Sequence, residues 1–171
     1  MAGRGREDLE RFCAQAYPEL VAALTHQFGD RWLAEELAQE ALVRVCGRWD
    51  RVAGLASPVG WAFRVGVNVG RSRIRRRMAE LRARARRGPD EQVHEDPEVA
   101  DRLAVAAALA ELSEREREVV VLRYFLGLSA GDAAQVLDSS AGAVRVSTHR
   151  AVLRLRAGLT EVDLEEVPDV S

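Results

Sequence analysis

The chain has 171 residues, of which 47% are apolar and 30% are charged, and its formal net charge is −2 at pH 7. A chain of this length and apolar content can bury a core, which argues against a largely disordered protein, and no apolar run approaches the length that spans a membrane. Alanine and arginine are the most frequent residues and leucine is also abundant, which is typical of an all-α protein.

The near-neutral charge conceals a strong segregation along the chain. Positions 61–87 contain ten arginines and one acid, whereas positions 90–101 contain six acids and no base. This asymmetry indicates a basic functional surface next to an acidic linker.

Neither the cysteines nor the histidines form a pattern typical of a metal site. Cys13 and Cys46 occupy apolar positions of helical segments, so we expect reduced core residues of a cytoplasmic protein. The three histidines are scattered, and no bound metal or other cofactor is expected. The N-terminal stretch MAGRGREDLE has no apolar signal core, in keeping with a cytoplasmic protein that has no membrane partner.

Two amphipathic helices are predicted at the start of the chain. Apolar residues recur with helical spacing between Asp8 and Phe28, and Pro18 is expected to bend or split this helix. Gly29 ends it, and Asp30 is a suitable N-cap for a second helix over 31–49. One side of the second helix carries an apolar stripe. The polar side chains of this helix fall largely on the other side: Glu36, Gln39, Glu40 and Arg44.

A third helix is predicted from Pro58 to about Arg87, with Ser57 as its N-cap. Its first half is apolar, and its second half, NVGRSRIRRRMAELRARARR, is basic around the whole circumference. Such a helix end either binds a polyanion or is a solvated end that runs into a linker, and the single sign of the charge favours nucleic acid. Trp61 and Phe63 are interpreted as core residues rather than as wedges that stack on bases.

The acidic segment GPDEQVHEDPE separates the two halves of the chain. With its glycine and two prolines it is interpreted as a flexible linker over 88–97. We therefore expect two small helical domains, at 7–87 and 98–159, followed by a short acidic tail at 160–171.

Four helices are predicted in the second domain. Ser113 with Glu116, and Ser129 with Asp132, form capping-box patterns at the starts of two of them, and the triplet DSS precedes the last helix, at 141–158. A short helix, a short turn and a longer basic helix fit a helix-turn-helix, but a plain four-helix bundle has the same pattern.

In a helix-turn-helix, the first half of the last helix would enter the major groove of DNA. Serine and alanine there permit close approach, and arginine, serine and threonine can reach phosphates or base edges. The candidate residues are Ser139, Ser140, Ala143, Arg145, Ser147, Thr148 and Arg150. Arg123 and Tyr124, in the helix that opens with Ser113, are interpreted as residues for packing and helix-dipole contacts rather than for DNA contacts.

Three segments in this order resemble an extracytoplasmic-function (ECF) sigma factor, the minimal two-domain member of the bacterial sigma-70 family. AEELAQEALVRV (34–45) resembles the family's segment that binds core RNA polymerase, and SPVGWAFRVGVNVGRSRIRRR (57–77) resembles its helix that reads the promoter minus-10 element. ALAELSEREREVVVLRYFLGLSAGDAAQVLDSSAGAVRVSTHRAVLRLR (108–156) resembles its minus-35-reading domain. The resemblance covers the chain from about position 8 to 159.

The resemblance implies a role for each group of candidate residues. Glu36, Gln39 and Glu40 would dock on the clamp helices of the largest polymerase subunit, and the C-terminal domain would bind the polymerase flap and the minus-35 duplex. The unwound minus-10 strand would be held by a polar and basic set: Asn68, Arg71, Arg73, Arg75 and Arg76. Many relatives carry an acid four residues after this asparagine, and Ser72 stands there instead. The resemblance further implies control by an anti-sigma factor that binds between the two domains.

The sequence holds no nucleophile–base pair, phosphate-binding glycine loop or paired carboxylate site, so a non-enzymatic protein is predicted. The principal alternative is a one-component transcriptional regulator that binds duplex DNA without polymerase. It leaves the 34–45 segment and the 71–77 arginines unexplained. A helical RNA-binding adaptor, the other alternative, accommodates the arginines but not the capped helix-turn-helix.

Overall fold

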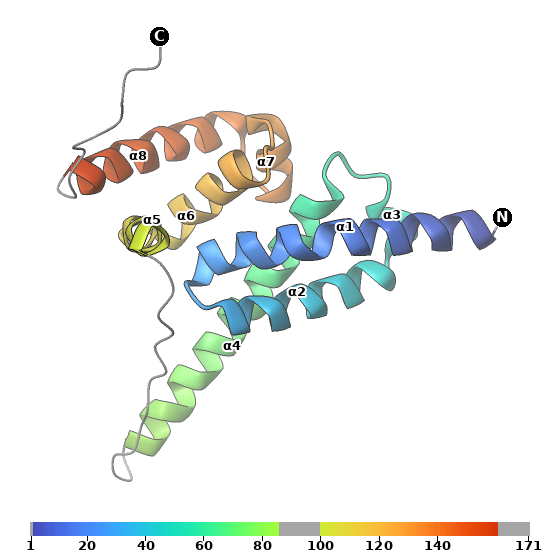
Figure 1. The fold of residues 1–171 in the computed structure, drawn as a ribbon, viewed down its shortest axis with the longest axis horizontal. Coiled ribbons are helices and arrows are strands. Elements are labelled where there is room, and N and C mark those ends of the chain that lie inside the picture. The colour runs from blue at the N-terminus through green and yellow to red at the C-terminus, as the bar shows by residue number, and fades with distance from the viewer. Residues whose placement is uncertain (1, 86–99, 161–171) are drawn as a thin grey trace. The chain divides into compact units, whose positions relative to one another are not determined.

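The computed structural model describes the backbone of residues 2–85 and 100–160 and the side chains of 5–83 and 105–157. The predicted linker at 88–97 and the acidic tail after Thr160 lie outside the described residues. The chain forms two compact units, Met1–Glu98 and Val99–Ser171. All regular secondary structure in the described part of each unit is helical (Figure 1), which confirms the all-α prediction.

The first unit consists of α1 (Ala2–Phe28), α2 (Arg31–Cys46), the short α3 (Trp49–Val52) and α4 (Pro58–Ala85). The helices α1, α2 and α4 pack against one another. The C-terminal half of α4 extends beyond the other helices of the unit (Figure 1). The largest fully buried side chains of the unit include Leu20, Leu24, Leu37 and Phe63.

Local capping determines where α2 and α4 begin, as predicted. The Asp30 side chain accepts a hydrogen bond from the Leu33 N–H at 3.0 Å, and the Ser57 hydroxyl oxygen accepts one from the Gly60 N–H at 3.0 Å. These side chains satisfy N–H groups that have no partner within the helix. Gly29, which ends α1, has a φ of 74° that favours glycine.

Two of the predicted boundaries in this unit were wrong. Helix α1 is continuous through Pro18 and begins at Ala2. Pro18 and Ala14, whose carbonyl loses its N–H partner, are both exposed, so water can satisfy that carbonyl and the helix need not break. The second helix ends at Cys46 instead of Trp49, and a separate turn of helix, α3, follows.

The expectation that both cysteines are core residues was also wrong. Cys46, at the end of α2, is exposed, and Cys13 is half-buried. Burial, with the nearby Cys46 thiol as a second cause, raises the pKa of Cys13 to about 11, so its thiol is neutral at physiological pH. Both cysteines are free.

The second unit contains α5 (Ala100–Ala110), α6 (Glu114–Val120), the π-helical turn η1 (Val121–Phe125), α7 (Ala130–Val136) and α8 (Ala141–Thr160). Helix α8 packs against α5, α6 and α7. One core cluster is formed by Leu109, Leu112, Val120 and Ala151.

The predicted caps of this unit are confirmed. Ser113 and Glu116 form a complete capping box at the start of α6, and the Ser129 hydroxyl oxygen accepts from the Asp132 N–H at 3.0 Å at the start of α7. The Ser140 hydroxyl oxygen accepts from the Ala143 N–H at 3.1 Å, which makes Ser140 the cap of α8. The short α7 and the capped α8 therefore stand in the order that a helix-turn-helix requires.

Candidate nucleic-acid and protein interfaces

The outer face of α2 carries the three residues predicted to bind polymerase. Glu36 and Gln39 are exposed, and Glu40 is half-buried. Two large apolar side chains lie on the same face: Trp32 is 76% exposed and Val43 is 69% exposed. Positions 32, 36, 39 and 43 follow the spacing of a single helical stripe, so the carboxylate and the amide of this stripe lie between two exposed apolar side chains.

Trp32 and Val43 were not among the binding residues predicted from the sequence. The prediction considered only the polar side chains on the side of α2 opposite its buried stripe. The sequence contained a signal for them, because a tryptophan and a valine at positions 32 and 43 fall outside the core stripe and so are predicted to be exposed.

The structure joins the polymerase-binding set to a residue of the minus-10 set. Arg73 of α4 donates from Nη1 to Glu36 Oε2 at 2.7 Å and from Nη2 to Glu40 Oε2 at 2.7 Å. Glu40 also accepts from Arg44, at 2.7 Å. The guanidinium of Arg73 thus bridges two carboxylates of α2, and its positive charge is balanced by them.

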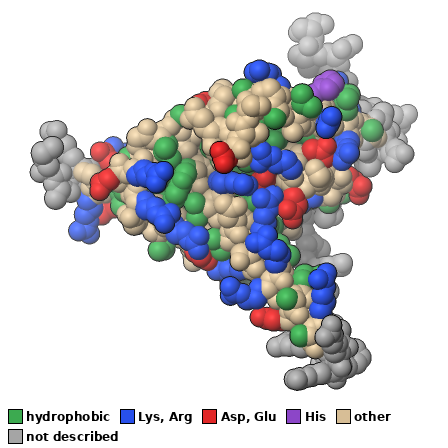
Figure 2. Space-filling model, turned by 180° about the vertical axis from the view of Figure 1, so that it is seen from behind, with side chains coloured by type: hydrophobic (Ala, Val, Ile, Leu, Met, Phe, Trp, Pro, Cys, Tyr) green, Lys and Arg blue, Asp and Glu red, His purple; other side chains and the backbone are tan. Residues whose placement is uncertain are grey.

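The other minus-10 candidates lie on α4 between positions 68 and 76, around the middle of the helix. Asn68, Arg75 and Arg76 are exposed, and Arg71 is half-buried. Ser72 is exposed beside Asn68 on the same side of the helix. Arginine side chains run along the C-terminal half of α4 with few acidic neighbours (Figure 2). Cations around an exposed polar residue can hold the phosphates of a strand whose base is read by the asparagine.

The residues predicted to bind the minus-35 duplex divide into two groups. Ser139, Ser140, Ala143, Arg145 and Arg150 are exposed at the turn and on α8. Ser147 and Thr148 are half-buried, and the Thr148 hydroxyl donates to the Val144 carbonyl at 2.8 Å. The hydroxyl hydrogen of Thr148 is therefore used within α8.

The two aromatic residues in the first half of α4 differ in burial. Trp61 is half-buried and Phe63 is fully buried, which confirms the core interpretation for Phe63.

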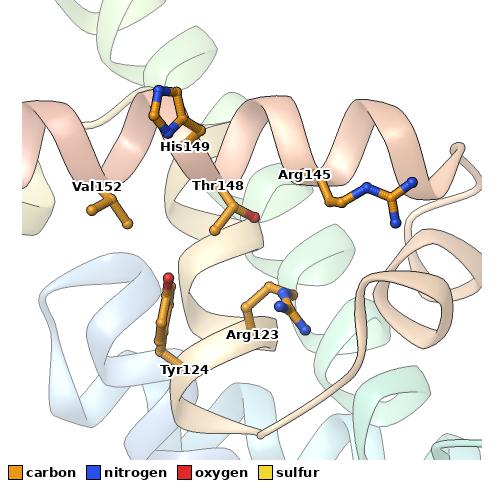
Figure 3. Close-up of a pocket in the computed structure, with 6 residues that line it drawn as sticks. All are labelled: Arg123, Tyr124, Arg145, Thr148, His149 and Val152. Atoms are coloured by element: carbon orange, nitrogen blue, oxygen red, sulfur yellow. The ribbon is translucent and has the colours of Figure 1, made fainter.

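A shallow groove of about 240 Å³ separates α8 from η1. In Figure 3, Thr148 and Val152 point from α8 toward Tyr124 on the opposite side. Arg123 donates to the Leu128 carbonyl ahead of α7, as its predicted structural role requires. Tyr124 is 61% exposed, so the packing part of its interpretation was wrong, whereas the helix-dipole part stays a prediction. It lies on the π-helical turn, which the sequence pattern did not predict.

Within the described residues no three His, Cys, Asp or Glu side chains are placed to hold a metal ion. Of the helices in the part of the chain that the structure describes, none combines the length and apolar character that crossing a membrane requires.

Comparison with known proteins assigns both units. Residues 13–80 match the family model of sigma-70 region 2, and residues 102–155 match that of sigma-70, region 4. The RNA polymerase sigma-E factor of Streptomyces avermitilis is 37% identical over 133 residues, which cover 77% of this chain and 74% of that protein. The ECF RNA polymerase sigma factor SigL of Mycobacterium tuberculosis is 33% identical over 139 residues, covering 78% of each.

Solved structures agree with these sequence matches. The sigma factor RpoE of Bartonella quintana, solved in complex with the anti-sigma factor NepR, matches with a TM-score of 0.76 at 26% identity, covering 92% of this chain and 99% of that one. CnrH, solved in complex with the cytosolic domain of CnrY, matches with a TM-score of 0.64 at 26% identity, covering 92% and 91% of the two chains.

Proposed function

This chain belongs to the extracytoplasmic-function group of the sigma-70 family, and we propose that it directs core RNA polymerase to promoters through the two interfaces described above. The observation that carries the proposal is the presence of sigma-70 region 2 and region 4 in this order, each on its own compact unit. A one-component regulator would account for the second unit alone.

The outer face of α2 is the proposed contact with the polymerase clamp. Its carboxylates can pair with cationic side chains of the polymerase, which steers association and fixes register. Trp32 and Val43 supply apolar area on either side of these charges. Because exposed aromatic anchors dominate the binding energy of many interfaces, Trp32 is expected to contribute more than either carboxylate.

The exposed side of α4 is the proposed minus-10 site. Asn68 would read a base of the unwound strand, and Arg71, Arg75 and Arg76 would hold its phosphates. Ser72 stands beside Asn68 where many relatives place a negative charge, so the detailed minus-10 specificity of those relatives is not carried over to this chain.

Helix α8 with its preceding turn is the proposed minus-35 reader. Ser139, Ser140 and Ala143 are small and exposed, so they allow the helix end to approach the duplex. Arg145 and Arg150 are exposed arginines that can bind guanine or phosphate. Ser147 and Thr148 are half-buried, and of the two only Thr148 lines the groove of Figure 3, through which it would contribute.

Regulation by an anti-sigma factor is part of the proposal, since the RpoE structure above is a sigma factor solved in complex with an anti-sigma factor. The protein itself would catalyse no reaction: it supplies binding energy that selects a promoter and holds one strand open, while the polymerase performs the chemistry. It would therefore act in the cytoplasm, where bacterial RNA polymerase and DNA are found.

Size-exclusion chromatography with core RNA polymerase from a Streptomyces species tests the proposal. We expect the protein to co-elute with core polymerase, and the double charge reversal Glu36→Arg/Glu40→Arg to weaken the complex. Failure to bind core polymerase, together with tight binding to duplex DNA alone, would instead establish a stand-alone regulator.

A further inference from the structure

We infer that Arg73 is a positioning residue for the polymerase-binding face of α2 and not a contact to promoter DNA. The inference rests on the proposed function, because it specifies how the α2 face is built. It also reassigns one residue of the minus-10 set.

The hydrogen bonds of Arg73 are the first observation. Both terminal nitrogens of its guanidinium donate to carboxylate oxygens of α2, each at 2.7 Å, across sequence separations of 33 and 37 residues. Charge-assisted bonds of this length are the strong ones, and a planar guanidinium fixes the direction of both. Arg73 is therefore already neutralised by two anions, so a phosphate gains little by approaching it.

The position of Arg73 around α4 is the second observation. At 3.6 residues per turn, Ser72 and Arg75 lie within about 40° of Asn68, whereas Arg73 lies about 140° away. A strand held by Asn68 and the exposed arginines beside it would follow one side of the helix. Arg73 lies away from that side, where α4 packs against α2.

The effect on the α2 face is the third step. Glu36 and Glu40 are four residues apart on one helix, and like charges at this spacing repel. Arg73 between them removes the repulsion and holds both carboxylates in fixed orientations, each through its Oε2. Glu36 remains 67% exposed, so its other oxygen can accept a bond from a partner. Arg73 thus presents the carboxylates in a geometry prepared for binding.

Variants of Arg73 test the inference when two quantities are measured separately. The first is the affinity for core polymerase. The second is the salt dependence of promoter binding by the assembled holoenzyme, using fragments that the holoenzyme selects from a random pool. We expect Arg73→Ala to lower core affinity about five-fold, with no change in the salt slope. Arg73→Lys keeps the positive charge but lacks the two terminal guanidinium nitrogens that bond both carboxylates, so its core affinity is expected to lie between those of Arg73→Ala and the unmodified protein.

Two controls make the result specific. Arg31→Ala removes another paired arginine, which bonds Glu35 at 3.0 Å. Both residues lie on α2 but outside the stripe proposed to bind polymerase, so this substitution should leave core affinity unchanged. Arg75→Ala should reduce the salt slope by about the value of one phosphate contact. In the Glu36→Gln/Glu40→Gln background, Arg73→Ala should have no further effect on core affinity, because the groups through which it acts are gone. Circular dichroism at the assay temperature checks that each variant is folded.

Unchanged core affinity of Arg73→Ala, with a reduced salt slope, would overturn the inference and return Arg73 to the minus-10 site. An undiminished loss of affinity in the Gln/Gln background would overturn it as well, because Arg73 would then act independently of the carboxylates. Absence of core binding by the unmodified protein would contradict the proposed function itself.

Discussion

Arg154 of α8 donates to the carboxylate of Glu116, at the start of α6, across 2.9 Å. The same oxygen, Oε2 of Glu116, accepts from the Ser113 hydroxyl at 2.7 Å and from the Ser113 N–H at 3.1 Å. Glu116 is only 8% exposed. One buried carboxylate therefore caps α6 and also ties the proposed DNA-reading helix to it.

Removal of this carboxylate is expected to loosen the second unit. Glu116→Ala removes the reciprocal half of the capping box and leaves Arg154 without this partner, so we expect a loss of about 1–2 kcal/mol in unfolding free energy. Hydrogen exchange of the full chain should show reduced protection in α6 and α8 and no change in α2. Glu111→Ala, at an exposed acid just before the cap, is the control, and equal effects of the two substitutions would contradict the role of Glu116.

The same carboxylate predicts a pH dependence. The Ser113 hydroxyl, opposed by burial and assisted by the Ser113 backbone, Arg154 and Arg150, lowers the pKa of Glu116. A group whose pKa is lower in the folded state stabilises the fold at pH values above its ordinary pKa, and this contribution is lost as the pH falls through the folded value. The urea midpoint should therefore fall more between pH 6 and pH 3 for the unmodified protein than for Glu116→Gln. Parallel curves for the two proteins would contradict the prediction.

The helix caps could be predicted from sequence because a cap is local. Asp30, Ser57, Ser113 and Ser129 each bond within three residues, so residue type and spacing suffice. The Arg73 fork could not be predicted, because it depends on where α4 crosses α2. The sequence does not distinguish Arg73 from the other arginines of the basic segment, because only the packing of α4 on α2 places it beside Glu36 and Glu40.

Tyr124 illustrates a second limit of the sequence pattern. The helical pattern continues from α6 through VLRYF, which suggests that the tyrosine packs inward. Tyr124 lies within the π-helical turn η1. A π-helix has more residues per turn than an α-helix, so positions in η1 are rotated from those that α-helical spacing predicts, and Tyr124 is exposed.

Close packing of α4 on α1 and α2 predicts a steric requirement at Gly70. A Cβ there would lie 2.4 Å from Cζ of Phe28 and 2.9 Å from Cδ1 of Leu37. Leu37 is fully buried and cannot turn away into solvent. Gly70→Ala is therefore expected to cost about 1–3 kcal/mol in unfolding free energy, despite the higher helix propensity of alanine.

Thermal or urea unfolding of the full chain measures this cost. Gly131→Ala in α7 is a matched control, because its added Cβ would approach nothing closer than the Ser129 hydroxyl oxygen, at 3.6 Å. It should be neutral or stabilising. A Gly70→Ala protein as stable as the unmodified one would show that α4 is packed less tightly than described.

The exposed tryptophan predicts a large effect on polymerase binding. Trp32→Ala should lower core affinity about ten-fold or more, because an aromatic anchor is lost from the proposed interface. Its side chain is 76% exposed, so the stability of the free protein should change little. Fluorescence anisotropy with labelled protein measures the affinity. Leu153→Ala, at a 51% exposed leucine of the second unit, is a control for general loss of apolar surface. Equal affinities of Trp32→Ala and the unmodified protein would remove Trp32 from the interface.

Transcription in vitro tests the central claim most directly. Core RNA polymerase from a Streptomyces species is incubated with fragmented genomic DNA of the organism that encodes this chain, with and without the protein, and transcript start sites are sequenced. If the chain acts as a sigma factor, new start sites appear only when the protein and core polymerase are both present, preceded by a shared pair of sequence elements at the minus-10 and minus-35 positions. Start sites identical to those of core polymerase alone would contradict it.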